Sequence, residues 1–180
     1  WILVGFLILI LLVGLVRVAK YRRANQINET PNIEKITSPG SYSLTVETSE
    51  GSRPYDIYVP SSYTNSNKYP VVFVFHGGAG DKNKAKSYIT SSDSEKGNFI
   101  LVYPEGLDEF KTIKGIQGTW NAGTCCGISS AKNVNDVEYS EKILSEISKK
   151  LSIDQERIYA TGISNGGMFV YKLACDSSRF

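Results

Sequence analysis

A serine between two glycines is the feature of this sequence that could do chemistry. Residues 162–166 read Gly-Ile-Ser-Asn-Gly and match the pattern G-x-S-x-G. The strand-like segment Arg157–Thr161 precedes them, and the helix-like segment Met168–Cys175 follows. In this context Ser164 is the expected nucleophile, because a sharp strand-to-helix turn presents its hydroxyl at the helix N-terminus. Glycines at 162 and 166 would let neighbouring backbone pass close by. The alternative is a glycine-rich turn with an incidental serine.

A second glycine-rich segment could complete the same chemistry. His76-Gly77-Gly78-Ala79-Gly80 follows Val71–Phe75, an apolar run typical of a strand that is buried on both faces. Backbone N–H groups of Gly77 or its neighbours, with the N–H of Asn165, could hold the oxyanion of an acyl-transfer intermediate. A plain glycine turn is the alternative. His76 is the only histidine in the sequence. Where a serine nucleophile lies in such a turn, the acid and the histidine that activate it follow it in chain order. His76 precedes Ser164 and is therefore expected to shape the loop rather than to act as the base.

The elements that must position these groups alternate between strands and helices. We expect strands at Ser41–Thr48, Arg53–Val59, Val71–Phe75, Phe99–Tyr103 and Arg157–Thr161, and helices at Asp81–Ser91, Asn135–Leu151 and Met168–Cys175. The first two strands should form a hairpin, and the later alternation predicts an α/β sheet with crossover connections. Residues 105–132, which include five glycines, are predicted to be a long functional loop. Further strands are expected after Phe180.

The N-terminal segment has the composition of a membrane segment. Its first 16 residues, WILVGFLILILLVGLV, contain no charge and fit either a spanning helix or the apolar part of a signal peptide. No clear cleavage site follows, which favours an anchor. We therefore divide the chain into an anchor or signal segment with a basic flank (1–23), a linker (24–40) and a domain (41–180).

Charge distribution argues against nucleic-acid binding but leaves the topology open. Four basic residues, Arg17, Lys20, Arg22 and Arg23, follow the apolar run, and without them the net charge of +2 becomes −2. The domain thus has no basic excess to attract nucleic acid. The positive-inside rule would hold the domain in the cytoplasm, unless upstream residues carry more positive charge. We expect an extracytoplasmic protein, either membrane-anchored or secreted.

Several motifs together resemble a known family. FHGGAG, VYPEG, TWNAGTCCG, NDV and RIYATGISNGGM are similar to motifs of polyhydroxybutyrate-depolymerase-type esterases and of the feruloyl and acetylxylan esterases of carbohydrate esterase family one. The resemblance spans Ser41–Phe180 and implies an α/β-hydrolase fold with a Ser-Asp-His triad. The acid and histidine of that triad have no counterpart here, so we expect an incomplete domain that is nearly inactive alone. The resemblance implies the following site residues: Ser164 as nucleophile, His76, Gly77 and Asn165 around the oxyanion, and Trp120 and Asn121 on a loop lining the substrate cleft. Trp120 has an alternative interpretation as a core residue.

The implied activity is hydrolysis of carboxylic esters through an acyl-enzyme. Substrates would be acyl esters on polysaccharides, such as feruloyl or acetyl groups, or polyhydroxyalkanoate-type polyesters. Alternatives are an acyltransferase or a serine peptidase with the same turn, and a non-catalytic surface-binding protein. No metal or organic cofactor is implied, and a single histidine without a C-x-x-C motif argues against a zinc site.

The chain has three cysteines, Cys125, Cys126 and Cys175. An odd number in an exported protein predicts one disulfide and one thiol that is free or paired elsewhere. We expect Cys175 to bridge to one member of the Cys125-Cys126 pair.

Overall fold

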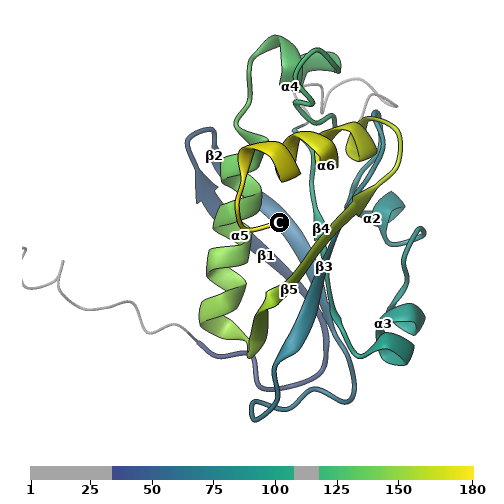
Figure 1. Ribbon diagram of the computed structural model, residues 1–180, viewed down its shortest axis with the longest axis vertical. Coiled ribbons are helices and arrows are strands. Elements are labelled where there is room, and N and C mark those ends of the chain that lie inside the picture. Colours follow the sequence, from purple (N-terminus) through teal and green to yellow (C-terminus); the bar gives the residue numbers. More distant parts are fainter. Residues whose placement is uncertain (1–33, 108–117) are drawn as a thin grey trace, which may run out of the picture. The chain divides into compact units, whose positions relative to one another are not determined.

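A five-stranded mixed sheet is the framework of the computed structural model, which describes residues 34–107 and 118–180 (Figure 1). The strands are β1 (Gly40–Thr48), β2 (Gly51–Val59), β3 (Tyr69–Phe75), β4 (Ile100–Pro104) and β5 (Ile153–Gly162). The helices are α2 (Lys82–Ala85), α3 (Ser91–Gly97), α4 (Gly127–Ala131), α5 (Asp136–Lys150) and α6 (Asn165–Asp176). The alternating order expected from the sequence is confirmed.

The strand order, β1-β2-β4-β3-β5, brings the two glycine-rich segments together. β1 and β2 form the expected antiparallel hairpin, and β2 is antiparallel to β4. β3 lies between β4 and β5 and is parallel to both. Phe75 at the end of β3 pairs with Gly162 at the end of β5, so the segments that follow these two strands emerge side by side. Ligands of α/β sheets bind at such carboxyl ends, where strand connections diverge.

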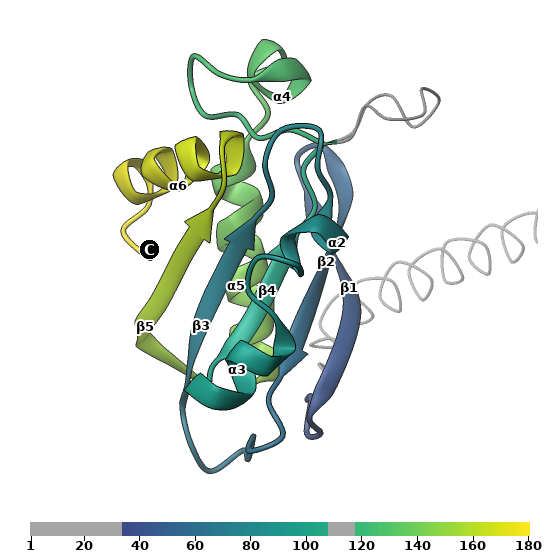
Figure 2. The same ribbon diagram turned by 90° about the vertical axis from the view of Figure 1, so that its right-hand side faces the viewer.

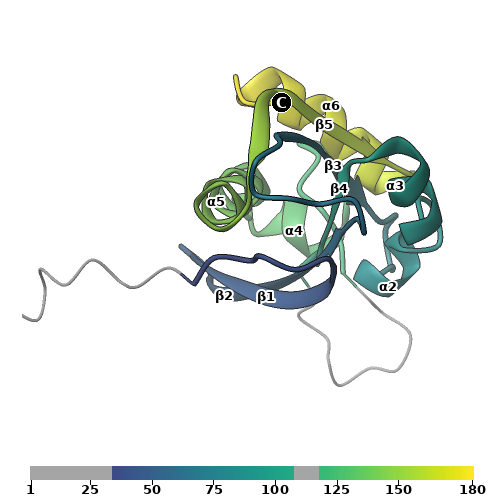
Figure 3. The same cartoon turned by 90° about the horizontal axis from the view of Figure 1, so that it is seen from below.

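Helices cover both faces of the sheet, which explains the continuous apolar runs. Figures 2 and 3 show α5 and α6 on one face and α2 and α3 on the other. Alternate residues of β3 face opposite layers: Phe73 and Phe75 join the core under α5 and α6, whereas Val74 packs with Ala85 of α2. Because neither face of β3 is left to solvent, both sets of side chains must be apolar.

The expected helix Asp81–Ser91 is wrong, since this stretch forms two short helices instead. Asp81 caps α2, where its Oδ1 accepts a hydrogen bond from the Lys84 N–H at 2.7 Å. A second helix start follows at Thr90, whose backbone N–H donates to Asp93 Oδ2 at 2.8 Å. This reciprocal Thr-x-x-Asp arrangement begins α3 and separates it from α2.

The N-terminal predictions lie mostly outside the described residues. The anchor or signal segment, residues 1–23, is not described, and the domain boundaries stay predictions. Within residues 34–107 and 118–180, the helices are all too short or too polar to cross a bilayer. The described end of the expected linker already packs on the domain, because Ile36 is buried and its N–H donates to Lys150 O at 3.0 Å.

Candidate active site

Ser164 occupies a strained turn between β5 and α6. Its backbone angles are φ 54° and ψ −123°, a left-handed φ that non-glycine residues adopt at an energetic cost. The turn is closed by two hydrogen bonds, from Gly166 N–H to Ile163 O at 3.0 Å and from Met168 N–H to Ser164 O at 2.9 Å. Ser164 is exposed at the N-terminus of α6. The turn thus presents the serine to solvent.

The glycines that flank Ser164 are required by close backbone contacts. A Cβ at position 162 would lie 2.7 Å from the carbonyl carbon of Gly166. A Cβ at position 166 would lie 2.5 Å from Phe75 O and would also clash with His76 O. The predicted reason for both glycines, the close passage of neighbouring chain, is therefore confirmed.

The glycine loop after β3 contacts the serine turn directly. A Cβ at Gly77 would lie 3.4 Å from Ser164 Cβ, and one at Gly78 would lie 3.5 Å from Asn165 Cβ. The two segments are thus in van der Waals contact, as the pairing of β3 with β5 requires. The start of the glycine loop therefore lies beside Ser164.

His76 is fully buried behind this loop and holds its shape. Its ring interacts with Gly77 O through Nδ1 at 2.8 Å, and its Nε2 accepts a hydrogen bond from Gly106 N–H at 2.9 Å. The Gly106 donor requires an unprotonated Nε2, so Nδ1 carries the proton and donates to Gly77 O. Burial also lowers the pKa of His76, which favours this neutral form. With both nitrogens engaged, the ring has none to offer Ser164.

Asn165 follows the serine and has two separate roles. Because it is the first residue of α6, its backbone N–H has no acceptor within the helix. Its buried side chain pairs with the backbone of Trp120: Oδ1 accepts from Trp120 N–H at 2.8 Å, and Nδ2–H donates to Trp120 O at 3.0 Å. The side chain thus anchors the turn while the backbone N–H stays available.

Trp120 and Asn121 face the interior. The Trp120 ring is fully buried and packs against Phe75, with ring centroids 5.1 Å apart. Asn121 is 4% exposed, and its side chain donates to Val134 O at 2.9 Å. Asn121 borders a surface pocket that Asn133, Lys172 and Asp176 also line, whereas the Trp120 ring is enclosed. The interpretation of Trp120 as a core residue therefore fits its burial.

A buried ion pair beside this loop was not expected from the sequence. Arg53 of β2 and Asp136 of α5 lie 2.8 Å apart, with side chains 4% and 0% exposed. Asp136 Oδ2 also accepts from Asn121 N–H at 2.7 Å, which ties the Trp120–Asn121 segment to α5. Burial raises the pKa of Asp136, whereas the Arg53 charge opposes that rise. An arginine in β2 at a position that alternates with the buried Tyr55 and Ile57 was the signal that could have revealed the pair.

Glu105, after β4, is a second acid that the sequence did not single out. Burial raises its pKa to about 7. Its Oε1 accepts from Lys82 N–H at 3.2 Å and lies 3.8 Å from His76 Nε2. The residue therefore changes charge near neutral pH directly behind the glycine loop.

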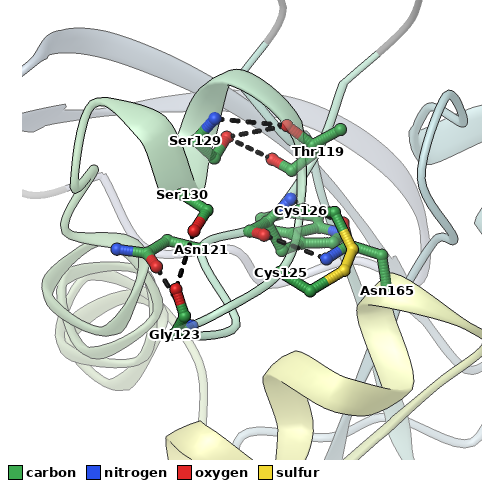
Figure 4. The surroundings of a disulfide bond; sticks show 9 residues. Thr119, Asn121, Gly123, Cys125, Cys126, Ser129, Ser130 and Asn165 are labelled. Carbon is green, nitrogen blue, oxygen red and sulfur yellow. Dashed lines mark hydrogen bonds between the residues drawn. A yellow bond between two sulfur atoms is a disulfide. The ribbon is translucent and has the colours of Figure 1, made fainter.

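The expected Cys175 disulfide is wrong. The structure joins Cys125 to Cys126 (Figure 4). Cys175 is free and exposed on α6. The bridged pair lies in the loop next to Asn165, since Cys126 N–H and Asn165 Nδ2–H both donate to Trp120 O. Cys175 has no disulfide partner among the described residues, and its side chain is exposed to solvent.

The chain resembles known proteins in sequence and in fold. No family model matches the chain. It is 29% identical over 128 residues to feruloyl esterase D of Neurospora crassa, a match that covers 71% of this chain and 42% of that protein. It is 31% identical over 122 residues to a bifunctional acetylxylan esterase/xylanase of Neocallimastix patriciarum, covering 66% of this chain and 15% of that protein.

A solved structure shows the same fold. An acetyl xylan esterase from Aspergillus awamori aligns with a TM-score of 0.56 and 18% identity, over 75% of this chain and 46% of that one. The chain spans less than half the length of each of these three proteins. Sequence and fold together identify the chain as a homologue of the feruloyl and acetylxylan esterases, with an α/β-hydrolase fold.

Proposed function

We propose that the protein containing this chain is a serine esterase that hydrolyses acyl groups carried by polysaccharides. The observation that carries the proposal is the exposed, strained Ser164 at the N-terminus of α6, in contact with the glycine loop after β3. A hydroxyl so placed meets free backbone N–H groups and the positive end of a helix dipole, which favour a developing oxyanion.

Peptide geometry supports Gly78, next to the expected Gly77, as the donor from the β3 loop. Gly77 O accepts hydrogen bonds from His76 Nδ1–H at 2.8 Å and from Gly80 N–H at 3.0 Å, both within the loop. In a trans peptide the C=O and the following N–H point in opposite directions. The Gly78 N–H is therefore turned away from these partners. With the Asn165 N–H, it would form a two-donor oxyanion hole, where one donor contributes roughly 3–4 kcal/mol to the transition state.

The proposed reaction proceeds in two steps through an acyl-enzyme. Ser164 attacks the ester carbonyl, a general base accepts its proton, and the alcohol leaves; water then releases the acid by the same route. His76 is the only histidine in these 180 residues, and it is buried with both nitrogens engaged. We therefore infer that a histidine base would come from another part of the full-length protein.

The names of the relatives favour feruloyl or acetyl esters of xylan-type polysaccharides over polyesters. An acyltransferase or a peptidase with the same turn is the alternative, and it would show dependence on an acceptor or on an amide substrate. We also infer a site of action outside the cytoplasm, with the protein secreted or anchored by residues 1–23.

Turnover of methyl ferulate and of an acetylated xylan by the full-length protein tests the proposal. We expect Ser164→Ala to lower kcat by about a thousandfold or more, because the nucleophile is lost. Ser92→Ala, which alters an exposed serine of α3, is the matched control and should keep the wild-type rate. Undiminished turnover by Ser164→Ala would overturn the proposal.

A further inference from the structure

Trp120 forms hydrogen bonds to both segments of the proposed oxyanion hole, through its backbone to one and through its ring to the other. Its backbone N–H and C=O pair with the side chain of Asn165, at 2.8 and 3.0 Å. Its indole Nε1–H donates to His76 O at 2.8 Å. Asn165 begins α6, whereas His76 begins the glycine loop after β3. One residue therefore links the segments that follow β3 and β5 through three buried hydrogen bonds, two from its backbone and one from its side chain.

We propose that Trp120 is a positioning residue that sets the separation between the two oxyanion donors, an inference that rests on the proposed esterase function. Trp120 acts through other residues. Its indole N–H holds the carbonyl of the His76–Gly77 peptide, and its backbone N–H and C=O hold the side chain of Asn165, which follows Ser164. Trp120 thus serves the reaction without contacting the substrate.

Packing keeps this link rigid. The Trp120 ring is fully buried and contacts three other rings: Phe75 at 5.1 Å, Phe169 at 5.6 Å and His76 at 4.8 Å between centroids. A ring held on three sides has few alternative rotamers, so its N–H stays directed at His76 O. A well-packed donor of this kind is preorganised, which is what an oxyanion hole requires.

Loss of the indole N–H would act on the loop selectively. Trp120→Phe keeps an aromatic ring in the same cluster and keeps both backbone bonds to Asn165. It leaves His76 O buried without its donor, which favours a rearrangement of the adjoining Gly77 peptide. A displacement of about 1 Å at a catalytic group can lower a rate by about a hundredfold.

The test compares Trp120→Phe with Phe169→Leu in the full-length protein, with methyl ferulate as substrate. Phe169 belongs to the same buried cluster but has no hydrogen bond to the loop, so its variant reports the cost of lost packing alone. We expect Trp120→Phe to lower kcat by about ten- to a hundredfold with KM changed less than about twofold. Phe169→Leu should lower the melting temperature and leave kcat within about threefold of wild type.

A second variant keeps the inference testable if Trp120→Phe does not fold. Asn165→Asp retains an acceptor for Trp120 N–H but replaces the donor to Trp120 O with a carboxylate oxygen, and it should also lower kcat selectively. Equal losses of kcat in Trp120→Phe and Phe169→Leu, or a wild-type kcat in a folded Trp120→Phe, would overturn the inference. If the Ser164→Ala variant instead keeps the wild-type turnover, the proposed function itself is refuted, and this inference with it.

Discussion

At the residue scale, hydrogen bonds to His76 decide the shape of the glycine loop. The buried ring donates to Gly77 O and accepts from Gly106 N–H, so it works as a neutral structural group. Its burial leaves little room at its neighbours, since a Cβ at Gly106 would lie 2.8 Å from His76 Cε1. The loop therefore depends on one protonation state of one histidine.

Glu105 should make the stability of the domain depend on pH. Its pKa is raised from 4.5 to about 7 by burial, with the charges of Asp81 and Asp56 adding to the rise and Lys82 opposing it. The folded state thus binds this proton more tightly than the unfolded state. Its stabilising contribution is complete below pH 4.5 and is lost as pH rises towards 7.

We therefore expect Glu105→Gln to flatten the pH dependence of the free energy of unfolding. Between pH 5 and 8 the wild type should lose roughly 2–3 kcal/mol more than the variant, from about 1.4 kcal/mol for each unit of pKa shift. Urea denaturation at several pH values measures this. The exposed Glu156, changed to Gln, serves as control. Parallel curves for wild type and Glu105→Gln would contradict the buried-acid interpretation.

Sequence reasoning identified the residues of the serine turn but not their supports. Gly162, Ser164 and Gly166 form a local pattern, and its meaning depends only on the adjoining strand and helix. Arg53 and Asp136 are 83 positions apart in the sequence, and only the packing of β2 against α5 brings them together. The disulfide was mispredicted for a similar reason, because the count of cysteines says nothing about which side of α6 Cys175 occupies.

At the element scale, the site exists because β3 and β5 are parallel neighbours. Their apolar, doubly buried sequences were recognisable, and so was the hairpin of β1 and β2. The division between α2 and α3 was missed because the Thr90 capping box lies inside a polar stretch with no clear helical periodicity. β5 proved longer than the expected Arg157–Thr161, since Ile153 pairs with Tyr69 beyond an irregularity in the register.

The close approach of α6 to the end of β3 leads to a stability prediction. A Cβ at Gly166 would overlap the backbone carbonyl groups of Phe75 and His76, which cannot move away unless the main chain shifts. Gly166→Ala should therefore cost about 3 kcal/mol or more, above the usual range for overpacking. Gly78→Ala is the control, because its Cβ would make an ordinary contact of 3.5 Å. Thermal unfolding of both variants measures this, and equal melting temperatures would contradict the packing described.

At the scale of the whole molecule, this chain holds the proposed nucleophile and oxyanion donors, but among its described residues no histidine is free to act as the base. The chain matches less than half of feruloyl esterase D and of the acetyl xylan esterase, and its single histidine is committed to the glycine loop. The 180 residues alone should therefore react slowly at Ser164, by about a hundredfold or more, which is the usual contribution of a general base.

Labelling with a fluorophosphonate, read by peptide mass spectrometry, tests the central claim most directly. In the full-length protein we predict one phosphonyl group on Ser164, none in Ser164→Ala, and a much slower reaction of the 180-residue chain. A full-length protein that hydrolyses feruloyl or acetyl esters while Ser164 stays unmodified would contradict the account.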